Sequence, residues 1–271
     1  MNAGIIRKTT REALPLLVIM SLAIILLESL LVGVIGEFAK ELEYLWLRRP
    51  IFERFARMLL GADLGGAVTT TGLMTIGFAH PLMFAFTWVF LLTTCSRAIV
   101  GEIERGTADL LLTLPVSRGA VYTSVSVVWM VAGVPVSLAP LLGPWIGQSI
   151  FELPEPLDSS RLAILTANLF ALYLAVGSAT LLVSSLVSRR ALAVALVLAW
   201  LLASFLLNFL GQFWLVAERI SALGVLHYYR PLPVVQTGDW PVRHIAVLLG
   251  LGALLWGVGL WRFARRDIPA V

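Results

Sequence analysis

Four polar residues lie inside long apolar stretches of this sequence, where their side chains could handle a substrate or a proton. They are Glu28, His80, Asn168 and Asn208. Such a group is costly in an apolar stretch unless it is paired or hydrated, so each marks a candidate functional position. Glu28 either lines a substrate path, pairs with a neighbouring hydroxyl, or reaches the membrane surface. His80 precedes Pro81 and is either a ligand or proton site or a hydrogen-bonded histidine at a kink. Asn168 and Asn208 either cross-link helices or contact a substrate.

A second candidate is the charged stretch AIVGEIERGTADLLLTLPVSRG, which separates two of the most apolar parts of the chain. Its leucines and isoleucines give it an apolar side, and its acidic and basic residues give it a charged side. This pattern is typical of a short helix along a membrane surface. We therefore predict a short helix at about 101–118, in a position where a cytoplasmic partner can dock.

Several catalytic motifs are missing from the sequence. It has no G-x-x-x-x-G-K-[ST] phosphate-binding loop, no H-E-x-x-H and no G-x-S-x-G. We therefore expect no ATP hydrolysis by this chain, no catalytic residue, no metal site and no bound cofactor. Cys95 is the only cysteine, which excludes an intramolecular disulfide. An intramembrane enzyme that uses Glu28, His80 or Asn168 is an alternative from a different class.

Membrane-spanning helices must position all of these residues. The chain is 59% hydrophobic and 13% charged, and its mean hydropathy is +0.92, which is outside the range of soluble domains. Continuous apolar stretches of about 20 residues or more predict helices that cross the bilayer, whereas a β-barrel would show short alternating segments. We predict an all-α membrane protein with one permease-like domain over 1–271 and six spans, at about 14–35, 73–97, 119–148, 162–187, 191–214 and 243–262. The third span contains several prolines and is expected to be kinked or broken.

The basic residues predict the orientation of these spans. With both termini in the cytoplasm, the inner segments hold more than half of the 20 Lys and Arg residues in the shorter total length. We expect a multi-pass protein of a bacterial or archaeal plasma membrane with both termini cytoplasmic. The pI of about 9.6 is explained by this topology, so no nucleic-acid partner is expected.

The outer segments are expected to be small. Residues 36–72 carry apolar residues at helical spacing on both sides of Pro50, which predicts two amphipathic helices at about 37–60. These helices either lie on membrane lipid, gate a substrate, or contact an outside partner. The second outer segment, 215–242, contains LHYYRPLP, which indicates either an ordered segment that re-enters the membrane or an interfacial anchor.

Two spans carry small residues at every fourth position, a spacing that lets helix backbones approach closely. Each series packs either within the subunit or at a dimer seam. The series are Ala171, Ala175 and Ala179 in the fourth span, and Ala191, Ala195, Ala199 and Ala203 in the fifth.

The stretch GEIERGTADLLLTLPVSR resembles the signature of ABC-2-type permeases, the membrane subunits of type V ABC transporters. Weaker likeness covers IIRKTTREALPLL, which is similar to the N-terminal interfacial segment of that family, and LHYYRPL and RFARRDI near the last span. The resemblance implies a homodimeric or paired permease with separate ABC ATPase subunits that bind ATP and Mg. It also implies that 101–118 is the coupling helix that contacts the ATPase, through Glu102, Glu104, Arg105, Gly106, Thr107 and Arg118.

The resulting expectation is an ATP-driven permease subunit, surrounded by membrane lipids, that exports or extracts a hydrophobic or amphipathic substrate. A small outer part disfavours an elaborate receptor role. The rival within the same class is an ABC-coupled subunit that serves an extracytoplasmic machine, such as metalloenzyme maturation or motility.

Overall fold

The computed structural model describes residues 1–48, 69–106, 116–211 and 214–266, with side chains of α1 described up to residue 37. Every regular element in these ranges is helical. In chain order the elements are α1 (Ala3–Arg48), α3 (Thr70–Phe78), α4 (Pro81–Ala98), α5 (Val100–Glu104), α7 (Arg118–Ile150), α8 (Ser159–Leu186), α9 (Arg190–Leu210), α10 (Leu215–Ser221), η1 (Val225–Tyr228), α11 (Pro231–Thr237) and α12 (Val242–Ala264).

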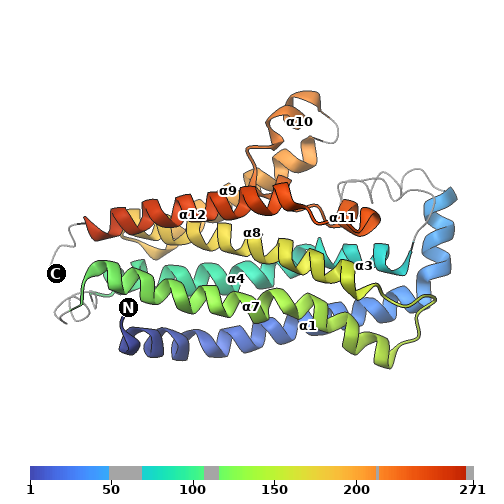
Figure 1. Cartoon of the computed structure of the whole chain (residues 1–271), viewed down its shortest axis with the longest axis horizontal. Coiled ribbons are helices and arrows are strands. Elements are labelled where there is room, and N and C mark those ends of the chain that lie inside the picture. The colour runs from blue at the N-terminus through green and yellow to red at the C-terminus, as the bar shows by residue number, and fades with distance from the viewer. Residues whose placement is uncertain (49–68, 107–115, 212–213, 267–271) are drawn as a thin grey trace.

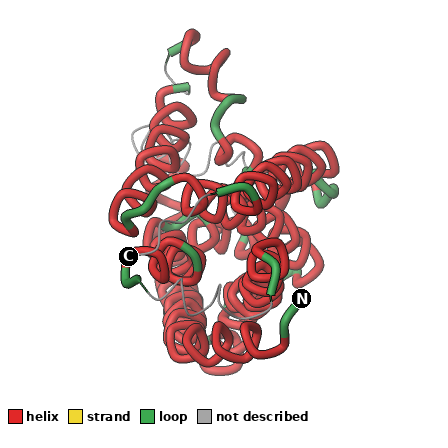
Figure 2. Tube along the Cα trace, turned by 90° about the vertical axis from the view of Figure 1, so that its left-hand side faces the viewer, coloured by secondary structure: helices red, strands yellow, loops and turns green. Residues whose placement is uncertain are grey.

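Six of these helices are long and apolar enough to cross a membrane, which confirms the predicted number of spans. They are α1 as far as Glu37, then α4, α7, α8, α9 and α12. The helices run along one bundle axis, and α1 begins at the same end at which α12 finishes (Figure 1). We call this the terminal end, and the other the opposite end. Figure 2, viewed from the terminal end, shows the bundle helices nearly end-on with the α9–α10 part leaning outward.

The predicted second span is two helices rather than one. α3 ends at Phe78 and α4 begins at Pro81, with His80 in an extended conformation between them. A residue before proline is driven out of the helical region, and proline lacks the N–H that a continuing helix needs. Pro81 is instead well placed as the first residue of a new helix. The prediction of one helix over 73–97 was therefore wrong.

Two other helices are more continuous than expected. α7 runs unbroken over 33 residues although Pro135, Pro140 and Pro144 lie inside it. α7 packs along α1, and the Ser29 hydroxyl of α1 donates to the Gly143 carbonyl at 2.8 Å. α1 extends unbroken from Ala3 to Arg48, so the N-terminal interfacial segment and the first part of the predicted 37–60 helices are continuous with the first span. The rest of that prediction, 49–60, lies outside the described residues.

α8 lies at the centre of the bundle and packs on α12, α7, α4 and α9. Its small residues Ala171, Ala175 and Ala179 are all buried. Gly252 of α12 faces this row, because a methyl group added there would touch the backbone of Ala175. The small residues of α9 behave differently, and Ala191, Ala195, Ala199 and Ala203 are all exposed.

The segment between α10 and α12 folds back onto the bundle instead of standing outside it. The Tyr228 carbonyl accepts the Asn168 side-chain amide of α8 at 3.2 Å, and the Tyr229 hydroxyl donates to the Phe78 carbonyl of α3 at 3.1 Å. Leu226 donates its backbone N–H to Ser204 of α9 at 2.9 Å. The segment around LHYYRPLP is therefore ordered and ties α3, α8 and α9 together.

Candidate functional site

The charged stretch after α4 begins with the short helix α5. Its C-terminal residue is followed by Arg105 and then Gly106, whose φ of 69° is left-handed. Glycine adopts this conformation without steric cost, and here it ends the helix. Of the predicted 101–118 helix, the described residues are helical only as far as Glu104, and Arg118 already belongs to α7. Thr107 and the rest of 107–115 lie outside the described residues.

Glu102 is buried at the terminal end of the bundle, with 5% of its surface exposed. It forms an ion pair with Lys8 of α1 at 3.1 Å and another with Arg105, one turn further along the chain. A buried carboxylate needs such partners to offset the loss of hydration. Glu102 thereby fastens the stretch after α4 to the first turns of α1.

Glu104 is exposed and reaches the beginning of α9. Its carboxylate accepts the backbone N–H of Arg190 at 2.9 Å, in the first turn of a helix whose own N-cap residue makes no side-chain cap. An acidic group at this position also interacts favourably with the helix dipole. The Arg190 side chain donates to Ser96 of α4 at 3.1 Å, so α4, α5 and α9 are joined at one point.

Arg118 begins α7 and donates to the carbonyl of Arg266, just beyond α12. Arg266 in turn donates to the Ser185 carbonyl at 3.0 Å and the Ser188 hydroxyl at 2.8 Å, at the end of α8. The structure therefore brings Glu102, Glu104, Arg105 and Arg118 to one end of the bundle. Glu102, Glu104 and Arg118 each link separate segments there, and Arg105 pairs with Glu102.

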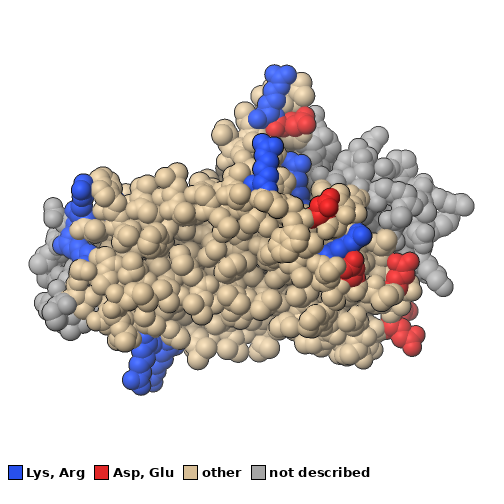
Figure 3. All heavy atoms as spheres, in the orientation of Figure 1, with Lys and Arg blue, Asp and Glu red and all other residues tan. Residues whose placement is uncertain are grey.

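The two ends of the bundle differ in charge. On the face that Figure 3 shows, basic side chains lie at the terminal end and around α10, whereas most of the acidic side chains lie toward the opposite end. The terminal end thus offers a positively charged layer held together by short polar contacts.

Two of the polar residues within the spans, Glu28 and His80, lie at the break between α3 and α4. Glu28 is fully buried and its carboxylate lies against Gly77 of α3. His80 caps α4, its Nδ1 accepting the Leu82 N–H at 3.2 Å, so it is a hydrogen-bonded histidine at a kink in this structure. Asn168 is buried and bonds to Tyr228. Asn208 lies apart from them, half-buried near the end of α9.

An apolar groove of about 500 Å³ lies next to this break, between α4 and α9. Phe84, Trp88, Leu198, Leu202 and Phe205 are among its lining residues. A groove with this lining suits the hydrocarbon part of a ligand. Among the described residues there is no group of three or more His, Cys, Asp or Glu that could hold a metal.

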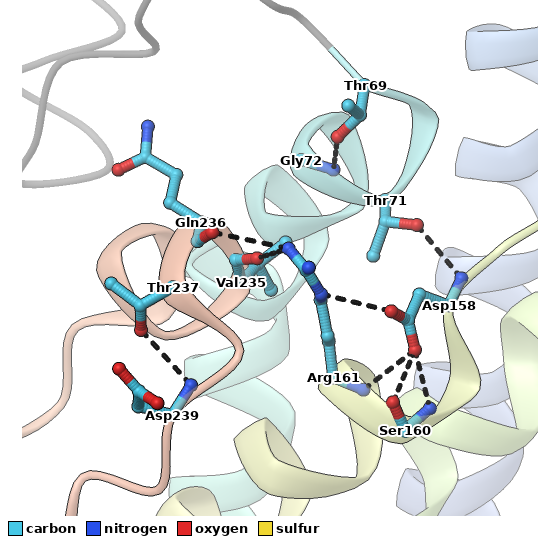
Figure 4. A network of polar contacts seen from close by, with 10 residues as sticks. All are labelled: Thr69, Thr71, Gly72, Asp158, Ser160, Arg161, Val235, Gln236, Thr237 and Asp239. Atoms are coloured by element: carbon cyan, nitrogen blue, oxygen red, sulfur yellow. Dashed lines mark hydrogen bonds and ion pairs between the residues drawn. The ribbon is translucent and has the colours of Figure 1, made fainter.

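A network of polar contacts around Asp158 and Arg161, at the opposite end, was not predicted from the sequence. Arg161 of α8 pairs with Asp158 at 3.0 Å and donates to the carbonyls of Val235 and Gln236 at the end of α11 (Figure 4). Asp158 caps α8, and its own N–H donates to Thr71 of α3 at 3.0 Å. Hydrogen bonds from the Ser160 hydroxyl and then from the Arg161 backbone lower the pKa of the Asp158 carboxyl. The sequence signal was an Asp placed directly before a helix, with Arg one turn later.

His227 forms a second unpredicted cluster, beside α10. Its Nδ1 accepts from Arg230 at 3.0 Å, because a guanidinium can only donate. Its ring also packs edge-on against His244, at 6.5 Å between centroids. Burial, and after it the charge of Arg230, lower the pKa of His227 to about 4. His227 is therefore neutral at neutral pH.

Comparisons of this chain with protein-family models, with curated proteins and with solved structures give no match.

Proposed function

We propose that this chain is the permease subunit of an ATP-driven transporter, with separate ATPase subunits bound at the terminal end. The observation that carries the proposal is the resemblance of the 101–118 stretch to a coupling helix. This stretch connects α4 to α7, and its described part lies at the terminal end. Because Glu102 contacts α1 and Glu104 contacts α9, a displacement of this stretch would reach several spans at once.

A second copy of the chain would pack on α9. The four alanines Ala191, Ala195, Ala199 and Ala203 leave an exposed, low-relief face on this helix, and such faces allow close approach of another helix. The corresponding alanines of α8 are already covered within the subunit. The substrate would be hydrophobic or amphipathic, because the groove between α4 and α9 is lined by aromatic and aliphatic side chains. We expect the substrate to be moved outward across the membrane.

Site-specific photo-cross-linking tests the ATPase partner. A photoreactive amino acid at Arg105, at the terminal end, should cross-link to a Walker-motif ATPase in native membranes. The same group at the exposed Glu155, before α8 at the opposite end, should not. Arg105 is preferable to Glu102 or Glu104, because it is exposed and its replacement leaves the contacts from Glu102 to Lys8 and from Glu104 to Arg190 in place. If the photoreactive amino acid at position 105 forms no cross-link to an ATPase, the proposal is refuted.

Disulfide cross-linking tests the dimer face. In a Cys95→Ser background, Ala195→Cys on α9 should give an oxidised dimer, whereas Ala179→Cys, buried on α8, should stay monomeric. Equal cross-linking of both variants, or of neither, would contradict a seam at α9.

A further inference from the structure

Glu28 has an environment that neither the coupling role nor the apolar groove explains. The residue is fully buried in α1, and neither carboxylate oxygen has a hydrogen-bond partner among the residues that the structure describes. The ion pairs described for this chain involve Glu12, Glu102 and Asp158, so Glu28 has no described cation beside it. Two acceptor oxygens without a donor are unusual in a closely packed site.

Close packing surrounds Glu28 on two sides. On the α3 side, a methyl group added to Gly77 would overlap the carboxylate itself, and on the α7 side, one added to Gly143 would meet the Cβ of Glu28 at 2.5 Å. These contacts leave no room there for an ion with its coordination shell. Whatever neutralises the carboxylate must therefore be very small.

The charges that face Glu28 do not favour an anion. The carboxylate lies against the last turn of α3, which ends at Phe78, and the C-terminal end of a helix carries partial negative charge. The titratable neighbour is the phenol of Tyr229, which follows η1. Its proton is directed to the Phe78 carbonyl and not to Glu28. The neighbouring residues of α3 and α7 are Gly77 and Gly143, which contribute no charge.

We propose that Glu28 is a protonation site, at which the carboxyl group binds a proton and is a neutral acid at neutral pH. The proton removes the cost of a buried, unpaired charge, and it turns one of the two acceptor oxygens into a donor. The neutral acid allows α1 to close against α3 and α7. Loss of the proton would place a negative charge beside the end of α3 and favour opening of this junction to water. The proposal does not depend on the ATPase partner.

Infrared spectroscopy of the full-length protein in lipid nanodiscs tests the protonation state directly. At about pH 8, well above the ordinary glutamate pKa of about 4.3, wild-type protein should show a protonated-carboxyl C=O band that Glu28→Gln removes. The matched control is Glu12→Gln, on the same helix but paired with Arg97 at 3.5 Å, which should leave the band unchanged. A wild-type spectrum without the band, or a band that Glu28→Gln leaves intact, would overturn the proposal.

A second measurement avoids dependence on the folding of a variant. Dicyclohexylcarbodiimide is an apolar reagent that adds to protonated carboxyl groups, so at about pH 8 it should modify Glu28 in wild-type protein while leaving Glu12 unmodified, as read by peptide mass spectrometry. Unmodified Glu28 under conditions that label a known protonated carboxyl would overturn the proposal.

Thermal unfolding adds a third readout. Because the native state binds one proton more than the unfolded state, the wild-type unfolding equilibrium should shift toward unfolding with rising pH, by up to about tenfold per pH unit relative to Glu28→Gln.

Discussion

The carboxylate of Glu104 accepts the backbone N–H of Arg190, 86 positions further along the chain, at 2.9 Å. This contact caps the first turn of α9 from a different part of the sequence. It joins the stretch that we propose as the coupling helix to the helix that we propose as the dimer face. The coupling stretch therefore has a structural role inside the subunit as well as its proposed role toward an ATPase.

Substitution of Glu104 should weaken the beginning of α9. Because N-cap contacts contribute about 0.5–2 kcal/mol, Glu104→Ala should lower stability by about 1 kcal/mol, and Glu104→Gln by less, since an amide oxygen still accepts a hydrogen bond. Thermal unfolding in nanodiscs measures this difference. Glu155→Ala, which removes an exposed acidic residue from a loop, is the control and should have no effect. Equal stability of wild type and Glu104→Ala would show that the contact contributes nothing.

A methyl group at Gly147 should disturb the packing of α1 on α7. The added carbon would meet Val32 Cβ at 2.7 Å and the Ser29 carbonyl oxygen at 2.9 Å, and overpacking of this kind costs about 1–3 kcal/mol. Gly147→Ala should therefore lower the unfolding temperature. Gly250→Ala in α12, where an added methyl has open space, should be neutral or stabilising by up to about 1 kcal/mol because alanine is the better helix former. A stable Gly147→Ala protein would mean that α1 and α7 are further apart than described.

Loss of the Arg161 side chain should release α11. Arg161→Gln removes the donors to the Val235 and Gln236 carbonyls, so the last turn of α11 should open more readily. Hydrogen exchange of residues 231–237 measures this, and we expect faster exchange there, corresponding to about 1 kcal/mol. Arg219→Gln, an exposed residue of α10, should leave exchange in 231–237 unchanged. Unaltered exchange in Arg161→Gln would show that these hydrogen bonds do not hold α11 in place.

The neutral state of His227 should make stability depend on acid pH. Its pKa is about 4 in the folded chain, lowered first by burial, against about 6.5 in an unfolded chain. Between these values the unfolded state binds more protons, so His227 makes the protein less stable as pH falls from about 6.5 to about 4. The stability difference between wild type and His227→Gln, measured by thermal unfolding, should therefore change in favour of the variant over this range. A difference that is constant with pH would show that His227 titrates normally. Differences are compared because other groups titrate in both proteins.

The number of spans and the approximate ends of four of them, α7, α8, α9 and α12, followed from the sequence. These features depend on composition along a single helix, because a bilayer requires about 20 apolar residues per span. The break at 79–80 was also visible in principle, since His80-Pro81 is a local signal. The continuity of α7 was not predicted, because a proline inside a helix locally favours a kink or a break, whereas the packing of α7 on α1 and α8 depends on distant segments.

The contacts inside the candidate site could not be predicted from the sequence, because they join segments that are far apart along the chain. Glu28 and Gly77, Glu104 and Arg190, and Arg161 and Val235 are each brought together by tertiary packing. The same limit applies to the two alanine series, which have identical spacing although the α8 series is buried and the α9 series is exposed. The sequence by itself determined which segments are helical and apolar enough to span a membrane, because those properties belong to each helix alone. Only the tertiary structure decided which face of each helix is covered and which charged groups are paired, because burial and pairing depend on what lies opposite.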